Sequence, residues 1–175
     1  MSKDKSAAAR VGIVMGSDSD LAVMKEAAEV LEEFGVPYEM TVASAHRSPD
    51  RAARYAATAA DRGLDVIIAG AGGAAHLAGV MAAGCTLPVI AVPLASSPLS
   101  GFDALLSSAQ MPPGVPVAVV SVGSWGARNA GLLAVQIIAR REAPLREALA
   151  RHKASMAEAV EAKARALEKG AHGRS

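Results

Sequence analysis

Short apolar segments alternate with segments of helical pattern along most of this chain, and no other feature constrains its fold as strongly. Mostly apolar segments of strand length cover residues 10–15, 38–43, 65–69, 88–92 and 115–122. Helical patterns cover residues 20–34, 48–63, 77–84, 101–109 and 127–141. Strands joined by helices at this spacing require right-handed crossovers, which make neighbouring strands parallel and place helices on both faces of the sheet. The alternation therefore predicts a three-layer α/β domain with a doubly wound parallel sheet of flavodoxin-like type.

The chain is expected to form one domain followed by a long helix. Its 175 residues are 51% hydrophobic, which is enough to bury a core without disulfides or a metal. We expect a disordered extension over residues 1–9, the domain over 10–141, an alanine-rich helix over 142–169, and a tail over 170–175. The apolar stripe of that helix predicts packing on a neighbouring subunit; packing on its own domain is the alternative. Residues 129–139 are apolar nearly all round, which also indicates a subunit contact.

Charge and composition favour a small-molecule ligand. A formal net charge of +1 and 3% aromatic residues provide neither the basic surface nor the stacking side chains of a nucleic-acid binder.

Between Val66 and Ala127 only Asp103 is charged, but prolines divide this stretch into pieces too short to cross a membrane. The single cysteine, Cys85, is expected in the core. The polar N-terminal residues lack the apolar segment of a secretory signal, so the cytoplasm is the expected compartment.

The first candidate binding segment is Gly16-Ser17-Asp18-Ser19-Asp20, which follows an apolar strand and opens a helix. Loops that leave the carboxyl ends of strands face one crevice in a doubly wound sheet. Gly16 and Ser17 can bind an anion through free N–H groups at a helix start, and Asp20 can accept hydrogen bonds from sugar hydroxyls. A ribose phosphate fits both groups. Alternatively these polar residues serve only as helix caps, with Asp18 or Ser19 as the capping residue.

A second candidate segment, Ser44-Ala45-His46-Arg47-Ser48-Pro49, follows the next strand and precedes a helix that Ser48 is expected to cap. Arg47 can hold a phosphate through paired hydrogen bonds, and His46 can give or take a proton near neutral pH. Taken alone, a His-Arg pair is more often a solvated turn. Two such segments after adjacent strands instead favour a phosphate site beside a proton-transfer group, with Ser44 in its wall.

The third segment is the glycine-rich run from Gly70 to His76. It loosely matches a dinucleotide-binding fingerprint, but the acidic residue required about twenty positions later is missing, so a nicotinamide or flavin dinucleotide is excluded. Gly72 and Gly73 can instead bring backbone against a flat ring, although dense packing explains glycines equally well. His76 either lines the same crevice or is a hydrogen-bonded structural histidine. The sequence has no metal-ligand spacing, Walker loop or serine-nucleophile motif.

Together these segments resemble the N5-carboxyaminoimidazole ribonucleotide mutases of purine biosynthesis. The motifs that carry the resemblance are, in order, GSDSD at 16–20, SAHRSP at 44–49, AGAGGAAHL at 69–77, QMP and GVPV within 110–117, and NAGLL at 129–133. The resemblance implies a flavodoxin-like subunit in a homo-octamer, with active sites between subunits and no metal or organic cofactor. It also implies transfer of a carboxylate from the exocyclic nitrogen of an imidazole ribonucleotide to a ring carbon.

The resemblance also implies roles for individual residues. Ser17 and Arg47 would hold the 5′-phosphate, Asp20 would bind the ribose hydroxyls, and His46 would act as the acid and base. The loop from Gly70 to Leu77 would hold the aminoimidazole ring and the carbon dioxide released during the transfer. The other residues expected to bind substrate are Gly16, Ser44, Gly72, Gly73 and His76.

Other functions stay open at this point. A related group of enzymes carboxylates aminoimidazole ribonucleotide directly with carbon dioxide, but its members carry Lys, often followed by Gly, where this chain has Arg47-Ser48. A non-catalytic nucleotide-phosphate sensor on the same fold would bind the ligand without chemistry. A response-regulator receiver fits less well, because the acidic cluster and lysine that it needs are missing. Leu21, Trp125 and Arg128 depart from the family pattern, and the last two bear on a subunit contact.

Overall fold

The computed structural model describes residues 8–172, so most of the expected extension at residues 1–9 and the end of the expected tail lie outside the described residues. The chain divides into two compact units, residues 1–137 and residues 138–175. The first unit contains the sheet and the candidate binding segments. The second contains the long C-terminal helix α6 (Ala143–His172).

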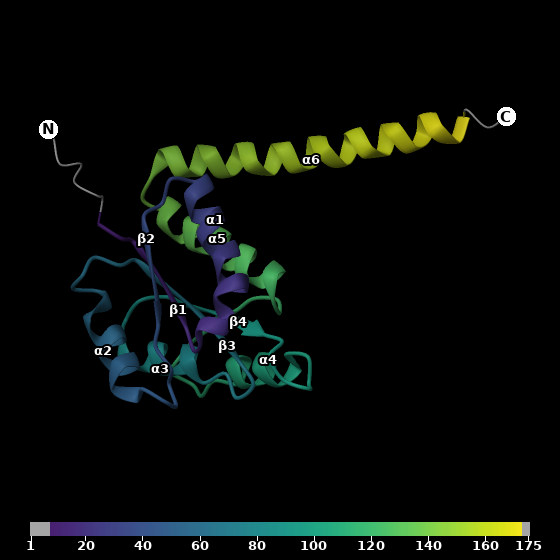
Figure 1. Ribbon diagram of the computed structural model, residues 1–175. Helices are drawn as coiled ribbons and strands as arrows, with labels where there is room; N and C mark the ends of the chain where they lie inside the picture. Colours follow the sequence, from purple (N-terminus) through teal and green to yellow (C-terminus); the bar gives the residue numbers. More distant parts are fainter. Residues whose placement is uncertain (1–7, 173–175) are drawn as a thin grey trace, which may run out of the picture. The chain divides into compact units, whose positions relative to one another are not determined.

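A five-stranded sheet forms the centre of the first unit (Figure 1). The strands are β1 (Val11–Met15), β2 (Tyr38–Val42), β3 (Val66–Gly72), β4 (Val89–Leu94) and β5 (Ala118–Val119). Their order is β2-β1-β3-β4-β5, and every neighbouring pair is parallel. This is the flavodoxin-like order, in which the chain moves from β1 to β2 and then crosses to β3 on the other side of β1. The predicted fold class is confirmed.

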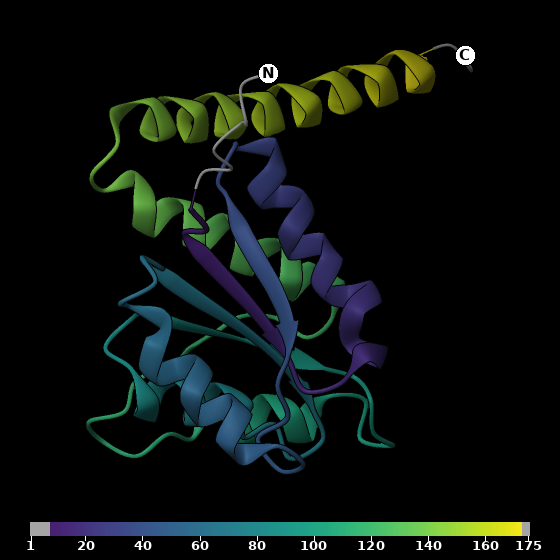
Figure 2. The ribbon, with the colours of Figure 1, turned by 60° about the vertical axis from the view of Figure 1, so that its left-hand side comes forward.

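Helices cover both faces of this sheet. They are α1 (Leu21–Glu33), α2 (Pro49–Ala59), α3 (Leu77–Gly84), α4 (Phe102–Ala109) and α5 (Ser124–Ala139), with a short 3₁₀ turn, η1 (Asp18–Asp20), before α1. Figure 2 shows α1 and α5 on one face and α2, α3 and α4 on the other. Small residues allow close approach between neighbours: a Cβ on Gly131 of α5 would lie only 2.8 Å from the carbonyl oxygen of Ala27 on α1.

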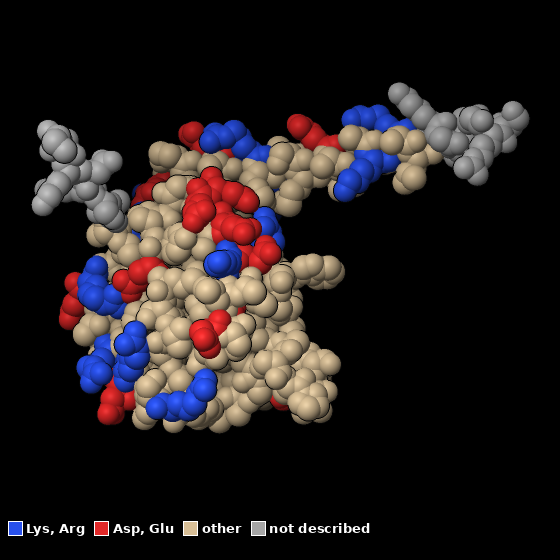
Figure 3. Space-filling view, in the orientation of Figure 1, with Lys and Arg blue, Asp and Glu red and all other residues tan. Residues whose placement is uncertain are grey.

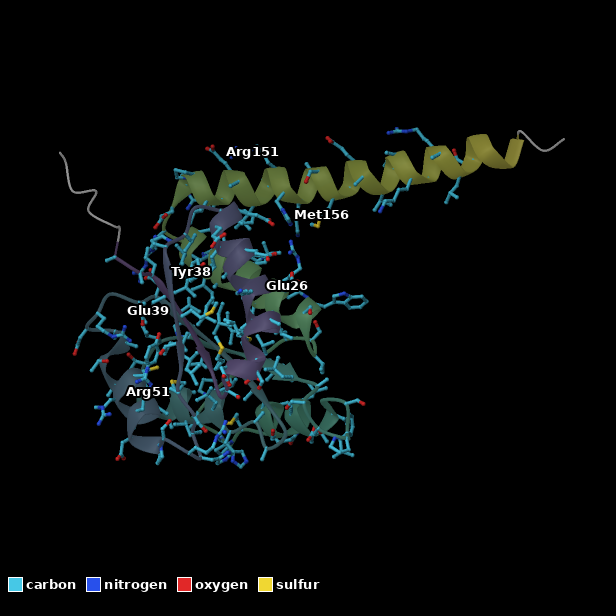
Figure 4. All side chains as sticks on the ribbon, in the orientation of Figure 1. Glu26, Tyr38, Glu39, Arg51, Arg151 and Met156 are labelled. Carbon is cyan, nitrogen blue, oxygen red and sulfur yellow. The ribbon has the colours of Figure 1, made fainter. Side chains whose placement is uncertain are left out.

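Buried apolar residues fill the central strands, as expected for parallel strands covered on both faces. All five residues of β1 and the first five of β3 are buried. β2 lies at the edge of the sheet and is only partly buried. Arg51 of α2 reaches back to this edge, where its Nε donates to the Val42 carbonyl oxygen at 2.7 Å and its Nη2 donates to Thr41 Oγ1 at 2.9 Å (Figure 4).

Two strand boundaries differ from the prediction. The predicted last strand, residues 115–122, is reduced to the two residues of β5. β5 is an edge strand, and the prolines at 112, 113 and 116 before it have no N–H groups with which to lengthen the pairing. β3 instead continues beyond the predicted residue 69 because it pairs with β4 as far as Gly72, which lies opposite Leu94.

Two expectations about burial and one about membrane crossing can be compared with the structure. Cys85 is half-buried rather than fully in the core, with its Sγ 3.9 Å from the Leu87 carbonyl oxygen. In the apolar segment 129–139, three large side chains stay half-buried: Leu132, Leu133 and Ile137. Within residues 8–172, no helix has both the length and the apolar character that crossing a bilayer requires.

The second unit consists mainly of α6, a single continuous helix (Figure 1). Arg146 in its first turn donates from Nη1 to the Ala139 carbonyl oxygen at 3.0 Å, which satisfies an acceptor at the end of α5. Further along α6, Met156, Val160 and Leu167 are 47%, 64% and 76% exposed. Lys, Arg and Glu side chains lie along the same helix (Figure 3). α6 therefore carries an apolar stripe with an exposed outer half.

Candidate active site

A cavity of about 420 Å³ opens beside the point where the strand order reverses between β1 and β3. The predicted site residues that line it are Gly16, Ser17, Asp20, Ser44, His46, Arg47, Gly72 and His76. The loops after β1 and β2 therefore meet, as predicted, and the loop after β3 joins them. Gly73 is not among the lining residues; it lies in the β3 loop with φ 60°, a conformation that favours glycine.

The loop from Gly16 to Asp20 is held by its own side chains. Ser17 Oγ accepts the Ser19 N–H at 3.4 Å, and Asp20 Oδ2 accepts the Ser17 N–H at 3.1 Å, which together form a capping box around η1. Ser17 therefore caps η1, and the N-cap residue of α1 is Asp20, which makes no capping bond to α1; the prediction of Asp18 or Ser19 is wrong. The reason is that the chain makes one 3₁₀ turn before α1 begins, which moves the cap toward the N-terminus.

These bonds change what the loop presents to an anion. The sequence predicts free N–H groups at Gly16 and Ser17. In the structure the Gly16 N–H donates to the Gly70 carbonyl oxygen at 3.2 Å, and the Ser17 N–H donates to Asp20. The Ser17 hydroxyl donates to the exposed Asp18 Oδ1 at 3.2 Å, a partner that it can exchange for a ligand oxygen. The loop thus offers hydroxyl groups rather than these two backbone N–H groups.

Asp20 is the buried carboxylate of the site, with 8% of its surface exposed. Burial raises the pKa of Asp20, and this effect exceeds the lowering by hydrogen bonds from the Ser17 N–H and the Ser19 hydroxyl and by the Arg47 charge. Oδ2 is engaged by Ser17, whereas Oδ1 has a more distant partner, Ser19 Oγ at 3.4 Å. Oδ1 is therefore the oxygen better placed to accept a ligand hydroxyl.

Two serines shape the loop that carries His46. Ser48 Oγ accepts the Ser44 N–H at 3.1 Å and donates to the Ser44 carbonyl oxygen at 3.2 Å, and Ser44 Oγ accepts the Arg47 N–H at 3.1 Å. Ser48 is the N-cap residue of α2, as predicted, but its side chain makes no bond to the helix. The hydroxyl is used instead to close the turn.

Arg47 links the first two loops. Its Nη2 donates to the Gly16 carbonyl oxygen at 3.2 Å, and the side chain is exposed in the cavity wall. A guanidinium has five N–H donors in a planar fork, so one bond to a carbonyl leaves donors for two oxygens of a phosphate. The Ser17 hydroxyl lies on the loop that Arg47 contacts. A cation and a hydroxyl donor thus stand at one end of the cavity.

His46 and His76 form a hydrogen-bonded pair. His46 Nε2 lies 2.8 Å from His76 Nδ1, and the rings meet edge to face with centroids 4.9 Å apart. Both side chains are exposed in the cavity, so the structure does not support His76 as a structural histidine of the core. One of these two nitrogens carries a hydrogen and donates it to the hydrogen bond, and the other nitrogen accepts that bond. Within residues 8–172, no group of three His, Cys, Asp or Glu side chains is arranged to hold a metal ion.

Close packing explains the glycine at position 72. A Cβ there would lie 1.7 Å from Ser96 Oγ and 3.1 Å from the Leu94 carbonyl oxygen, so only glycine allows the loops after β3 and β4 to meet. Ser96 also lines the cavity, although Ser96 itself was not predicted as a site residue. The signal available for it was weak: a small hydroxyl residue shortly after the fourth strand, in a segment with several such residues.

Comparisons with known proteins agree with this geometry. A model of the AIR carboxylase family matches residues 10–159. The N5-carboxyaminoimidazole ribonucleotide mutase of Pyrococcus horikoshii is 57% identical over 158 residues, covering 90% of this chain and 88% of that protein. The mutase of Bacillus subtilis is 62% identical over 128 residues, covering 73% and 79%. The phosphoribosylaminoimidazole carboxylase of Schizosaccharomyces pombe is 57% identical over 159 residues, which are 91% of this chain but 28% of the yeast protein.

A solved structure has the same fold. The crystal structure of PurE from Treponema denticola superposes with a TM-score of 0.77 at 29% sequence identity, covering 86% of this chain and 92% of that one. The family match runs from residue 10 to residue 159 and includes every loop that lines the cavity. Because the family model matches most of its length and the Pyrococcus horikoshii relative is 57% identical over 90% of it, the chain belongs to the AIR carboxylase family.

Proposed function

We propose that this protein converts N5-carboxyaminoimidazole ribonucleotide into 4-carboxy-5-aminoimidazole ribonucleotide in purine biosynthesis. The observation that carries the proposal is the placement of His46 and Arg47 at adjacent positions of one loop, in a cavity also lined by Ser17 and Asp20. A proton carrier and a phosphate-binding cation then face two ends of one ribonucleotide. Relatives that are 57% and 62% identical carry the name of this mutase.

Each end of the substrate has matching groups in the cavity. Arg47 and the Ser17 hydroxyl bind the 5′-phosphate, because they provide charge and donors at the same loop junction. Asp20 accepts hydrogen bonds from the ribose hydroxyls through Oδ1. The aminoimidazole ring lies against the β3 loop at Gly72, opposite His46. Gly16, Ser44 and His76 complete the wall of the binding site.

The chemistry needs one group that first gives and then takes a proton. Protonated His46 donates to the exocyclic nitrogen, the bond from that nitrogen to the carboxylate carbon breaks with its electron pair left on nitrogen, and carbon dioxide is released. The ring carbon then attacks carbon dioxide and forms the new carbon–carbon bond. Neutral His46 removes the hydrogen of that carbon as a proton, which restores the aromatic ring. His46 ends as it began, so the sequence of steps balances without a cofactor.

The protein must also keep carbon dioxide beside the ring between these steps. Orientation in a closed site favours recapture over escape. The β3 loop suits this role because its glycines and alanines leave little charge or bulk near the ring. We place the enzyme in the cytoplasm, in keeping with its single free cysteine, Cys85.

We further propose that the protein works as a homo-octamer, with α6 packing on a neighbouring subunit. Four large apolar side chains of the first unit are strongly exposed: Leu99, Phe102, Leu106 and Trp125. Figure 3 shows few charged side chains over α4 and the start of α5, where most of these residues lie. Exposed apolar surface of this kind is typical of subunit contacts. Multi-angle light scattering tests the assembly, and a monomer would contradict it.

A second candidate is carbon-dioxide-dependent carboxylation of aminoimidazole ribonucleotide, because the Schizosaccharomyces pombe relative is named phosphoribosylaminoimidazole carboxylase. One experiment separates the two reactions. Purified protein is incubated with the carbamate substrate without bicarbonate, or with aminoimidazole ribonucleotide and bicarbonate, and the carboxylated product is followed by its absorbance. Rapid turnover of the carbamate alone identifies the mutase. Turnover that depends on bicarbonate identifies the carboxylase, and thermal stabilisation by nucleotide without product identifies a sensor.

A further inference from the structure

Two serines of α4 hold the backbone next to His76. The Ala75 N–H donates to Ser107 Oγ at 3.0 Å, and Ser108 Oγ donates to the Ala75 carbonyl oxygen at 3.5 Å. Both donor and acceptor of the Ala75 peptide groups are therefore tied to a helix that follows more than twenty residues later in the chain. Neither serine lines the cavity. Of the two bonds, the one to Ser107 is the shorter and carries more weight.

The roles of the Ser107 hydroxyl are fixed by its position in α4. Its hydrogen is donated to the Ala104 carbonyl oxygen at 3.2 Å, in the preceding turn of the same helix. A lone pair is then left to accept the Ala75 N–H, which also approaches the Gly73 carbonyl oxygen at 2.9 Å. Ser107 is half-buried and sits on a helix, so it anchors the β3 loop from a second element of the domain.

Two residues, Ala75 and His76, connect this anchor to the proton carrier. Ala75 precedes His76, the N-cap residue of α3, and His76 Nδ1 contacts His46 Nε2 at 2.8 Å. His46 projects from the β2 loop and is exposed, so its ring has few other contacts to hold it. A loop displaced at Ala75 would carry His76 away and leave the His46 ring free to rotate. The path runs from Ser107 through Ala75 and His76 to His46.

We propose that Ser107 is a positioning residue that, through Ala75 and His76, orients the ring of His46 for proton transfer. The proposal rests on the mutase function proposed above. The histidine pair has a property that suits it to this reaction. Its hydrogen bond is kept when both rings are neutral and when one ring carries an added proton, and it is broken only when both are protonated. One proton can therefore be given and recovered while the two rings stay in contact.

Steady-state kinetics of substituted proteins provide the first test. Ser107→Ala removes the side-chain acceptor of the Ala75 N–H and leaves only the Gly73 carbonyl oxygen, and Ser107→Cys keeps the volume with a much weaker acceptor. We expect both to lower kcat about tenfold with KM changed less than about twofold, since a displacement near 1 Å can cost about 100-fold and the loop keeps its other bonds. Ser107→Thr keeps the hydroxyl and should restore most of kcat. Thr58→Ala is the matched control.

The control removes a helix hydroxyl with a similar back-bond but no contact with the site. Thr58 Oγ1 donates to the Arg54 carbonyl oxygen at 2.9 Å on the exposed surface of α2. The Thr58→Ala variant should have the kcat and KM of the wild type. If the loss of a helix hydroxyl had only a structural effect, both Thr58→Ala and Ser107→Ala would lower stability. A lower kcat at constant KM in Ser107→Ala but not in Thr58→Ala therefore indicates a positioning role.

A second measurement does not depend on turnover. In protein labelled with ¹⁵N-histidine, the ring nitrogens of His46 and His76 report whether one proton is held between them. We expect resolved donor and acceptor signals in the wild type and Ser107→Thr, and averaged signals in Ser107→Ala and Ser107→Cys. Unchanged ring signals in Ser107→Ala would overturn the inference, as would a wild-type kcat. If the wild-type protein fails to convert the carbamate, the mutase proposal fails, while these spectra still decide whether Ser107 orients the pair.

Discussion

Gly72→Ala is expected to distort the active site while leaving the domain folded. An alanine Cβ at this position would lie 1.7 Å from Ser96 Oγ, 2.8 Å from Ser96 Cβ and 3.1 Å from the Leu94 carbonyl oxygen. The Ser96 hydroxyl can rotate away. The contact between the two Cβ atoms remains, and bringing it to an ordinary separation of about 3.6 Å requires the backbone of one loop to move by about 0.8 Å.

The size of this movement sets the expected losses. A misplacement of about 1 Å can reduce the rate of a catalysed step by about 100-fold, so we expect kcat/KM to fall by about 10- to 100-fold. Overpacking costs about 1–3 kcal/mol in a tight core. Ser96 is exposed and its loop can yield, so about 1 kcal/mol is expected here, equivalent to a lowering of Tm by about 2–4 °C for a chain of this size.

A double variant tests the cause of the loss. Ser96→Gly in the Gly72→Ala background removes both Ser96 contacts and leaves only the 3.1 Å approach to Leu94. Most of the lost kcat/KM should return, measured against Ser96→Gly alone as the baseline. The product is followed by absorbance, and Tm by calorimetry. Wild-type activity in Gly72→Ala, or no recovery in the double variant, would refute the argument from close packing.

Three further substitutions address the charged and titratable groups. His46→Asn cannot carry a proton, so kcat should fall by about 10²–10⁴-fold with KM within about threefold; turnover near the wild-type rate at saturating substrate would remove its acid and base role. Arg47→Gln loses the phosphate-binding cation and should raise KM by about 10- to 100-fold, and an unchanged KM would place the phosphate elsewhere. Burial raises the pKa of Asp20, so the folded chain holds this proton more tightly than the unfolded chain. The unfolding free energy of wild type relative to Asp20→Asn should therefore fall as pH rises above about 4 in urea titrations; a rise would contradict burial as the dominant cause.

The order of strands and helices could be predicted because its signals are local. Apolar runs such as residues 10–15 and 88–92 are too continuous for one-sided strands, and the segments between them have helical spacing. The right-handed crossover rule then leaves few topologies. The shortness of β5 could not be read in the same way, because pairing at a sheet edge depends on the neighbour that is present and not on the apolar pattern of the strand itself.

The candidate site was predicted in outline for the same reason. Parallel strands bring their carboxyl ends to one edge, so the loops holding Ser17 and His46 had to be neighbours. The hydrogen-bonding state of each group could not be predicted. The Ser17 N–H is satisfied by Asp20, and His46 is bonded to a histidine thirty residues away, both through contacts of about 3 Å. The local sequence pattern would be the same if the two groups of each contact lay several ångströms apart.

The sequence by itself determined the layers of this protein, the strands from which its binding loops emerge and the residue types available for phosphate binding and proton transfer. Only the tertiary structure decided that His76 faces His46, that Asp20 is buried, and that Ser107 accepts a hydrogen bond from the loop that carries His76. The physical reason lies in length scale. Periodicity and turn preferences act over a few residues, whereas hydrogen bonding requires placement within a few tenths of an ångström, which depends on the packing of α3 and α4 against the whole sheet.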